Sequence, residues 1–158
     1  MSAGNELSKL FRRDITRLLQ ELKAFPDEEA LWQRLPGISN SAGNLALHLE
    51  GNLREYIGRQ LGRVPYDRQR DLEFSSPGLQ LHDLLQRLTV VKEMIPDIVS
   101  GLSHAVLEAN YPEKVLSAPL STRQFLIHLH GHLNYHLGQI DYLRRILTQG
   151  TAIPFAGL

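Results

Sequence analysis

The chain has 158 residues, 42% of them hydrophobic and 22% charged, which is the balance of one soluble globular domain covering residues 1–158. Its 17 lysine and arginine residues equal its 17 aspartate and glutamate residues, so no overall positive field favours binding to nucleic acid or to anionic lipid. The absence of cysteine excludes disulfides, thiolate metal sites and a cysteine nucleophile.

The first half of the chain predicts two long helices. Apolar residues recur every three or four positions over residues 5–25, which is typical of a helix with one face toward a core. A short helical turn follows, ahead of a loop at Pro36-Gly37. Serine and asparagine at positions 39–41 can cap a second amphipathic helix over residues 39–60.

Two more long helices are predicted in the second half. Residues 63–78 are rich in charged residues, proline, serine and glycine and show no sustained period, so we expect a long connection there. Helical periodicity resumes over residues 76–102. After an irregular crossover at residues 103–120, Ser121 can cap a last helix over residues 121–149.

These elements predict the fold class. No segment alternates apolar and polar residues for long enough to predict a sheet. Amphipathic helices of this length bury their apolar stripes most simply against one another, so we predict an all-α fold: a four-helix bundle with a long crossover connection between the second and third predicted helices. The C-terminal tail is also expected to pack against the protein, because it carries the apolar residues Ile153, Pro154, Phe155 and Leu158.

The sequence carries no sign of export or of membrane insertion. The N-terminal segment has no basic region followed by an apolar one, as a secretory signal would. No stretch approaches the roughly 20 apolar residues that span a bilayer. We therefore expect a cytoplasmic protein with no membrane partner.

Histidine is the informative residue type, because three histidines lie on the core-facing arc of the last predicted helix. His128, His132 and His136 follow one another at intervals of four, and Gln139 shares their face. A buried imidazole needs partners for both ring nitrogens, and this spacing lets two rings converge on one ion. The pattern predicts a metal site in the core of the bundle.

Other polar residues of the long helices are expected at the surface. In the last helix, His130 and Arg144 fall on the face opposite the core. Arg144 and Arg145 could bind an anionic substrate, but two arginines at a helix end more often interact with the helix dipole and solvent. His82 and His104, near the ends of the third helix, are also interpreted as surface residues.

The second predicted helix should supply a further ligand. His48 lies at the border of its apolar stripe and is the expected third ligand. Asn52 and Glu55 lie one and two turns further along the same strip. Glu55 could supply a carboxylate instead, although a charged residue on the flank of a helix is more often solvated.

Two segments resemble the signature regions of the DinB/YfiT-like superfamily. One is Tyr135-His136-Leu137-Gly138-Gln139-Ile140-Asp141-Tyr142-Leu143-Arg144-Arg145, preceded by His132, and the other is Asn44-Leu45-Ala46-Leu47-His48-Leu49. The helix order, the long connection after the second helix and the Ser-Thr-Arg start of the last helix also fit, so the resemblance covers nearly the whole chain. Many relatives have His-His before Gly-Gln, whereas this chain has Tyr135 at the first of those two positions.

The resemblance implies a four-helix bundle, usually a homodimer, that holds a divalent metal through one histidine of the second helix and a His-X-X-X-His pair of the last. Carried onto this sequence, the ligands are His48, His132 and His136. Characterised members of the superfamily include transferases and isomerases that use the metal to activate a low-molecular-weight thiol. Others are described as metal-dependent hydrolases.

Three neutral imidazoles leave at least one coordination position for water or a thiol, which is the arrangement of a catalytic metal. Imidazole ligands favour Zn or Ni. The leading hypothesis is a transferase that activates a low-molecular-weight thiol for attack on a small-molecule electrophile. The alternatives are a hydrolase, in which metal-bound water attacks, and a non-catalytic, stress-related protein that binds a metal or ligand.

Four further residues receive roles next to the metal. Gln139, Asn52 and Tyr135 are candidates to support a ligand or a bound substrate, or they line a polar seam between helices. His128 lies one turn before the His132 and His136 pair and could replace or join a ligand.

Overall fold

The protein is all-α, as the sequence predicts. The computed structural model describes residues 2–75, 78–115, 117 and 119–154. Within these ranges every regular element is helical, and the sole strand-type pairing is an isolated bridge between Asn110 and Ser121. None of the helices described there is both long and apolar enough to cross a membrane.

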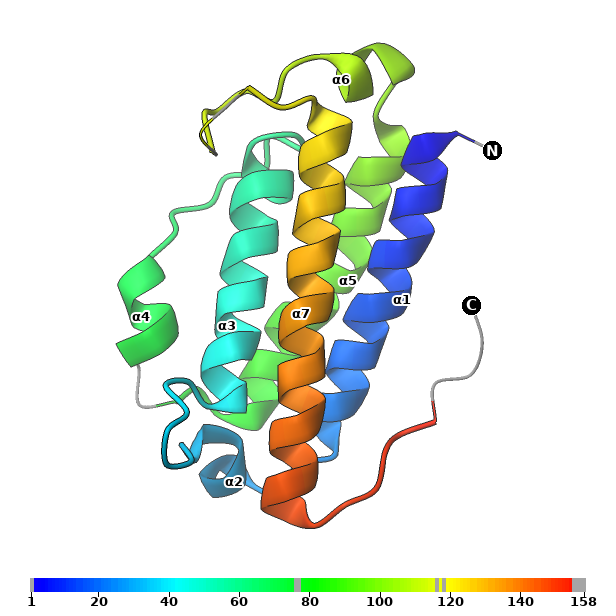
Figure 1. The fold of residues 1–158 in the computed structure, drawn as a ribbon. Helices are drawn as coiled ribbons and strands as arrows, with labels where there is room; N and C mark the ends of the chain where they lie inside the picture. Colours follow the sequence, from blue (N-terminus) through cyan, green and yellow to red (C-terminus); the bar gives the residue numbers. More distant parts are fainter. Residues whose placement is uncertain (1, 76–77, 116, 118, 155–158) are drawn as a thin grey trace.

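The core is enclosed by long helices that lie side by side (Figure 1). They are α1 (Ala3–Lys23), α3 (Ala42–Leu53), α5 (Leu81–Gly101) and α7 (Thr122–Thr148). Helix α1 contacts α5 and α7, and α3 contacts the same two helices, so α1 and α3 face each other across the core. Helix α3 continues into a π-helical segment, η1 (Arg54–Arg59). Such segments are rare and often lie next to functional sites.

The expected ranges 5–25, 39–60 and 121–149 overlap α1, α3 with η1, and α7. Ser41 caps α3 through a reciprocal capping box with Asn44, and Ser121 caps α7. The third helix was expected from residue 76, which lies outside the described residues. Helix α5 begins at Leu81, because Gly78 has a φ of 73°, a left-handed conformation that an α-helix does not contain.

Three short helices connect the long ones: α2 (Glu28–Trp32), α4 (Arg70–Ser75) and α6 (His104–Glu108). The first matches the predicted helical turn. Helix α4 was not predicted, because residues 63–78 were expected to be irregular. Helix α4 is too short to show a helical period in the sequence, and it packs against the outside of α3 (Figure 1). Contacts of this kind stabilise a helix that would be marginal on its own.

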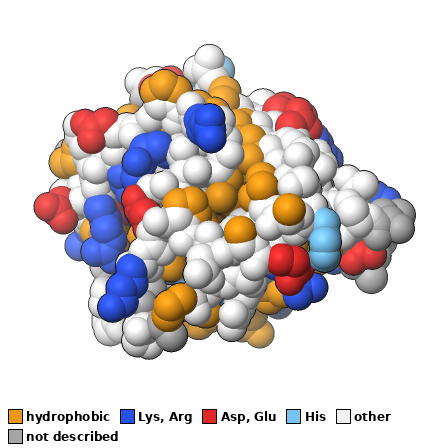
Figure 2. Space-filling model, turned by 90° about the horizontal axis from the view of Figure 1, so that it is seen from above, with side chains coloured by type: hydrophobic (Ala, Val, Ile, Leu, Met, Phe, Trp, Pro, Cys, Tyr) orange, Lys and Arg blue, Asp and Glu red, His pale blue; other side chains and the backbone are white. Residues whose placement is uncertain are grey.

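The apolar stripes of the long helices meet in one core. Fully buried apolar side chains come from each of these long helices: Phe11, Ile15, Leu18, Leu22, Leu49, Leu53, Leu84, Leu88, Ile95, Leu126, Leu133 and Ile140. Seen from the end that carries α6, the surface shows hydrophobic side chains near its middle, with charged side chains of both signs around them (Figure 2).

Two residues expected to face solvent on the last helix instead contact α1. Arg144 is only 3% exposed and forms an ion pair with Glu21. His130 is partly buried, and its Nε2 lies 2.8 Å from Asp14 Oδ2. The prediction was wrong because α1 presents buried carboxylates to α7, which widens the covered arc of α7 beyond its apolar stripe.

The segment after α7 is held by the same arginine. Arg144 Nη2 donates to the carbonyl of Thr151 at 3.0 Å. Ile153 is half-buried and Pro154 is exposed. Phe155 and Leu158, which were expected to pack against the protein, lie outside the described residues.

Candidate metal centre

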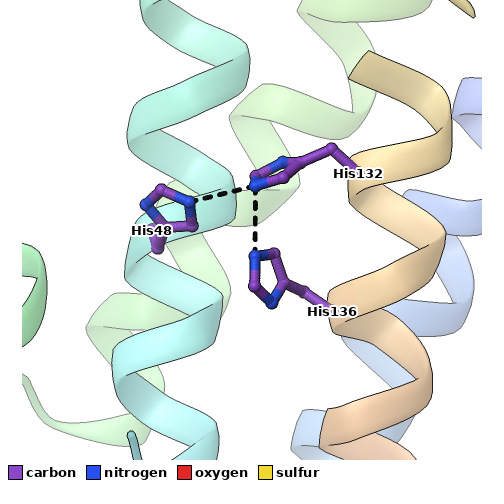
Figure 3. A group of neighbouring side chains, drawn as sticks. All are labelled: His48, His132 and His136. Carbon is purple, nitrogen blue, oxygen red and sulfur yellow. Dashed lines mark hydrogen bonds between the residues drawn. The ribbon is translucent and has the colours of Figure 1, made fainter. Parts of the chain in front are cut away.

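Three histidines point toward one another between α3 and α7 (Figure 3). His132 Nε2 lies 3.1 Å from His48 Nε2 and 3.1 Å from His136 Nε2. One nitrogen of each ring lies within 4.8 Å of those of the other two. The structure thus brings together the three residues expected as ligands, and this group could hold a metal ion.

Local structure explains why the rings meet. His132 and His136 are one turn apart, so they project from the same face of α7. His48 lies on α3, which packs against that face. All twelve residues of α3 are buried, because α7, α5 and α4 all cover it.

His48 is fixed by a charged pair that reaches it from the connection before α5. Its Nδ1 donates to Glu73 Oε2 at 2.8 Å. Arg68 donates to the same carboxylate through Nε at 2.7 Å and Nη2 at 2.9 Å. Burial alone would raise the pKa of Glu73, but the hydrogen bonds from His48 and Arg68 lower it. An ionised Glu73 keeps the ring proton of His48 on Nδ1 and leaves the Nε2 lone pair free.

His136 is fixed in the same way by its own helix. Its Nδ1 donates to Gln139 Oε1 at 2.6 Å, which also leaves the Nε2 lone pair free. Burial lowers the pKa of His136 despite the hydrogen bond to Gln139. Gln139 is thus hydrogen-bonded to one of the expected ligands, and its role in supporting a metal ligand stays a prediction.

His132 lies between the other two rings. Burial, followed by repulsion from His136 and His48, lowers its pKa to about 4, so the imidazole is neutral near pH 7. Its Nδ1 is buried and has no hydrogen-bond partner among the described residues. A neutral imidazole is the form that binds a metal.

This arrangement fits a metal ion. His48 and His136 both direct an Nε2 lone pair at His132 Nε2. His132 Nε2 carries at most one proton, so it can donate a hydrogen bond to only one of those two lone pairs. A single cation would accept the lone pairs of all three nitrogens. Nitrogens that bind one zinc ion tetrahedrally lie about 3.3 Å apart, close to the 3.1 Å observed twice here. The donor set is the neutral nitrogen set that suits Zn or Ni.

The other residues singled out in the sequence lie around this group, with different contacts. Asn52 is buried, and its Oδ1 has no hydrogen-bond partner within the described ranges. Tyr135 is 65% exposed, and its ring packs edge-to-face with the His136 ring at a centroid distance of 5.1 Å. His128 does not join the three histidines: it is exposed, contrary to the core position expected, and stacks on Phe125. Glu55 pairs with Arg59 instead of approaching the histidines.

Two surface assignments agree with the structure. His82 and His104 are both exposed. Neither belongs to the group that could hold a metal.

Glu73 and Arg68 are not predictable as partners of His48 from the sequence. Both lie in the connection that shows no helical period, so no pattern relates them to a histidine 20 or 25 positions earlier. Close packing makes their approach possible, because Gly51 of α3 has no side chain where the Glu73 carboxylate lies.

A cavity of about 210 Å³ opens beside the histidines. His48 and His132 form part of its wall, together with Asn52, Arg68 and His128. A small molecule could therefore reach the side of the three-histidine group that faces this cavity.

Comparison with known proteins identifies the family. Residues 10–140 match the family model of the DinB superfamily. The chain belongs to the DinB superfamily. This DinB-superfamily chain is similar in structure to a DinB-like protein from Bacillus cereus ATCC 10987, with a TM-score of 0.65 and 17% sequence identity over 92% of this chain and 90% of that one. No curated protein matches it.

Proposed function

We propose that His48, His132 and His136 bind one divalent ion, Zn or Ni, and that the protein is a metal-dependent transferase. In this proposal a low-molecular-weight thiol attacks a small electrophile. The observation that carries the metal site is the meeting of three Nε2 atoms, two of which have their lone pairs fixed by hydrogen bonds at Nδ1. Membership of the DinB superfamily supports the same ligand set.

The ion, when bound, supplies a Lewis acid that favours the deprotonated form of a thiol or water. The protein's own groups prepare the site. Glu73 and Gln139 hold the ring protons of His48 and His136 at Nδ1, and the buried position of His132 keeps that ring neutral. The cavity of about 210 Å³ would receive the substrate beside them.

Three further features belong to this proposal. The packing of α1, α3, α5 and α7 supports the four-helix bundle, and the connection that carries α4 is the long crossover between its second and third helices. The homodimer comes from the superfamily resemblance. Size-exclusion chromatography with light scattering tests the dimer.

Metal content tests the site. Protein purified without an affinity tag or chelator should contain one divalent ion per chain by elemental analysis. His48→Ala, His132→Ala and His136→Ala should each lose it while keeping their helix content. His130→Ala is the matched control and should retain the ion, because His130 contacts Asp14 instead of the three-histidine group. Retention of the ion by His136→Ala would refute the ligand set.

Thiol dependence tests the reaction. Turnover of a small electrophile that requires both the metal and an added thiol supports the transferase. Turnover with metal alone would instead identify a hydrolase that uses water. Absence of metal even after Zn or Ni is added would favour the non-catalytic alternative.

A further inference from the structure

Two arginines line the cavity beside the three histidines, and one of them is paired with a buried acid behind the wall. Arg68 and Arg70 both line it, and no aspartate or glutamate is found among its described lining residues. Arg68 uses Nε and Nη2 to hold Glu73, which leaves its Nη1 group for another partner. An anionic group inside this cavity would therefore meet the Nη1 donors of Arg68, whose charge Glu73 balances, and the guanidinium of Arg70.

Arg70 is available for such a group. It is exposed and forms no ion pair with any described residue. Its guanidinium lies 5.7 Å from the centre of the Phe74 ring, and Phe74 in turn packs against the His48 ring with centroids 5.0 Å apart. These two contacts hold the cation close to the metal site.

Arg70 also stands where the cavity meets solvent. A second, outer cavity of about 500 Å³ shares Tyr56, Arg68 and Arg70 with the inner one. Three acids line the outer cavity: Glu55 and Glu113, which Arg59 pairs, and the exposed Asp67. Arg70 thus belongs to the walls of both cavities.

A second and independent feature points to a ligand with a hydrogen-bond donor. Asn52 is 8% exposed and lines the inner cavity, yet its buried Oδ1 has no partner in the described part of the chain. A buried acceptor without a partner is destabilising, so it normally has one. An amino or hydroxyl group on a molecule in the cavity would supply that partner once the Asn52 amide turns its enclosed oxygen toward the cavity.

We propose that the inner cavity binds small molecules that carry a carboxylate together with a neighbouring amino or hydroxyl group. The carboxylate binds Arg70 and the Nη1 group of Arg68, and the amino or hydroxyl group donates to Asn52 Oδ1. The third functional group of such a molecule, a thiol in the reaction proposed above, then lies beside the three histidines. The inference rests on the proposed function, because it names the substrate class of the same site.

Three thiols that differ by one group test this assignment. L-cysteine carries both the carboxylate and the amine, 3-mercaptopropionate lacks the amine, and cysteamine lacks the carboxylate. Each is titrated into the full-length, zinc-loaded chain under reducing conditions, and dissociation constants and affected residues are read from two-dimensional NMR spectra. L-serine repeats the titration without a thiol, so the carboxylate subsite is measured independently of thiol chemistry.

We expect L-cysteine to bind at least about tenfold more tightly than cysteamine, the size expected for one charge-assisted hydrogen-bonded contact. Arg70→Gln should remove this preference, and Asn52→Ala should bring L-cysteine to the affinity of 3-mercaptopropionate. Arg123→Gln is the matched control, because Arg123 is exposed, pairs with Glu108 and does not line the cavity. It should leave all affinities unchanged.

Two results would overturn the inference: equal affinities for L-cysteine and cysteamine, or an unchanged preference in Arg70→Gln. Either result, together with thiol-dependent turnover, would refute the carboxylate subsite and leave the proposed function intact. Binding of L-serine that depends on Arg70, without metal or thiol-dependent turnover, would refute the proposed function and keep the subsite.

Discussion

Glu73 Oε2 accepts a hydrogen bond from His48 Nδ1 at 2.8 Å, although 25 positions separate the two residues. Arg68 holds the other side of the same carboxylate. A carboxylate behind a ligating histidine fixes the tautomer and the direction of the ring and increases the basicity of the nitrogen that faces the ion. The short helix α4 therefore contributes to the candidate metal centre as well as to the connection between α3 and α5.

Replacing this carboxylate should weaken metal binding. We expect Glu73→Gln to lower zinc affinity by about tenfold to 100-fold, because a neutral amide orients His48 less strongly. Competition with a chromogenic chelator measures the affinity. Glu29→Gln removes an equivalent but exposed acid of α2 and should behave as wild type. Equal affinities in the two variants would show that Glu73 does not support the site.

Gly51 offers a second way to displace Glu73. A methyl group at this position would overlap the Glu73 carboxylate and lie 3.0 Å from its Cδ. Alanine normally stabilises a helix interior by about 1 kcal/mol relative to glycine, so poor folding is not expected from helix propensity. We expect Gly51→Ala to keep its helix content by circular dichroism while its zinc affinity falls toward that of Glu73→Gln. Gly101→Ala, where a Cβ meets nothing within 4 Å, should bind zinc normally.

Asp14 should make stability depend on pH. Burial alone would raise its pKa, but hydrogen bonds from His130, Arg13 and Asn134 outweigh burial and hold it well below the usual range. A depressed carboxyl pKa stabilises the fold above the unfolded value of about 3.9, and this contribution is lost as the pH falls toward the folded value.

The comparison of Asp14→Asn with wild type tests whether Asp14 stabilises the fold at neutral pH and loses this effect in acid. Urea denaturation at pH 7 should show a loss of about 3–5 kcal/mol, the usual cost of breaking a buried ionic network. The difference in free energy of unfolding between wild type and Asp14→Asn should become smaller when the measurement is repeated near pH 3. The exposed Asp71→Asn serves as control and should change little at either pH. A difference that stays constant with pH would contradict the assignment.

Arg144 and Arg145 are adjacent in the chain, but their replacement should lower the stability of the protein by different amounts. Arg144→Ala leaves Glu21 buried without its partner and should lower the free energy of unfolding by about 3–5 kcal/mol. Arg145 is part-exposed, and its contact with Asp141 is 3.6 Å long, so Arg145→Ala should cost about 0–1 kcal/mol. Urea denaturation of both variants measures the contrast. Equal losses would argue against a structural role for the buried pair.

Sequence periodicity was sufficient to predict the long helices and the contacts between residues of the same helix. The long helices and their serine caps follow from residue spacing, because positions three or four apart on a helix share a face whatever surrounds them. The same rule placed His132, His136 and Gln139 together on α7, and the hydrogen bond between His136 and Gln139 is its direct result.

The contacts between distant segments depended on the tertiary structure. The carboxylates of α1 cover His130 and Arg144, which a helical wheel of α7 alone assigns to solvent. The arrival of Glu73 behind His48 depends on how α4 packs against α3. A helix of one or two turns leaves no period in the sequence, and its position is set by the surface that it covers. Spacing along α7 therefore determined the positions of His132 and His136 relative to each other. Packing between helices determined which residue, Glu73, orients His48.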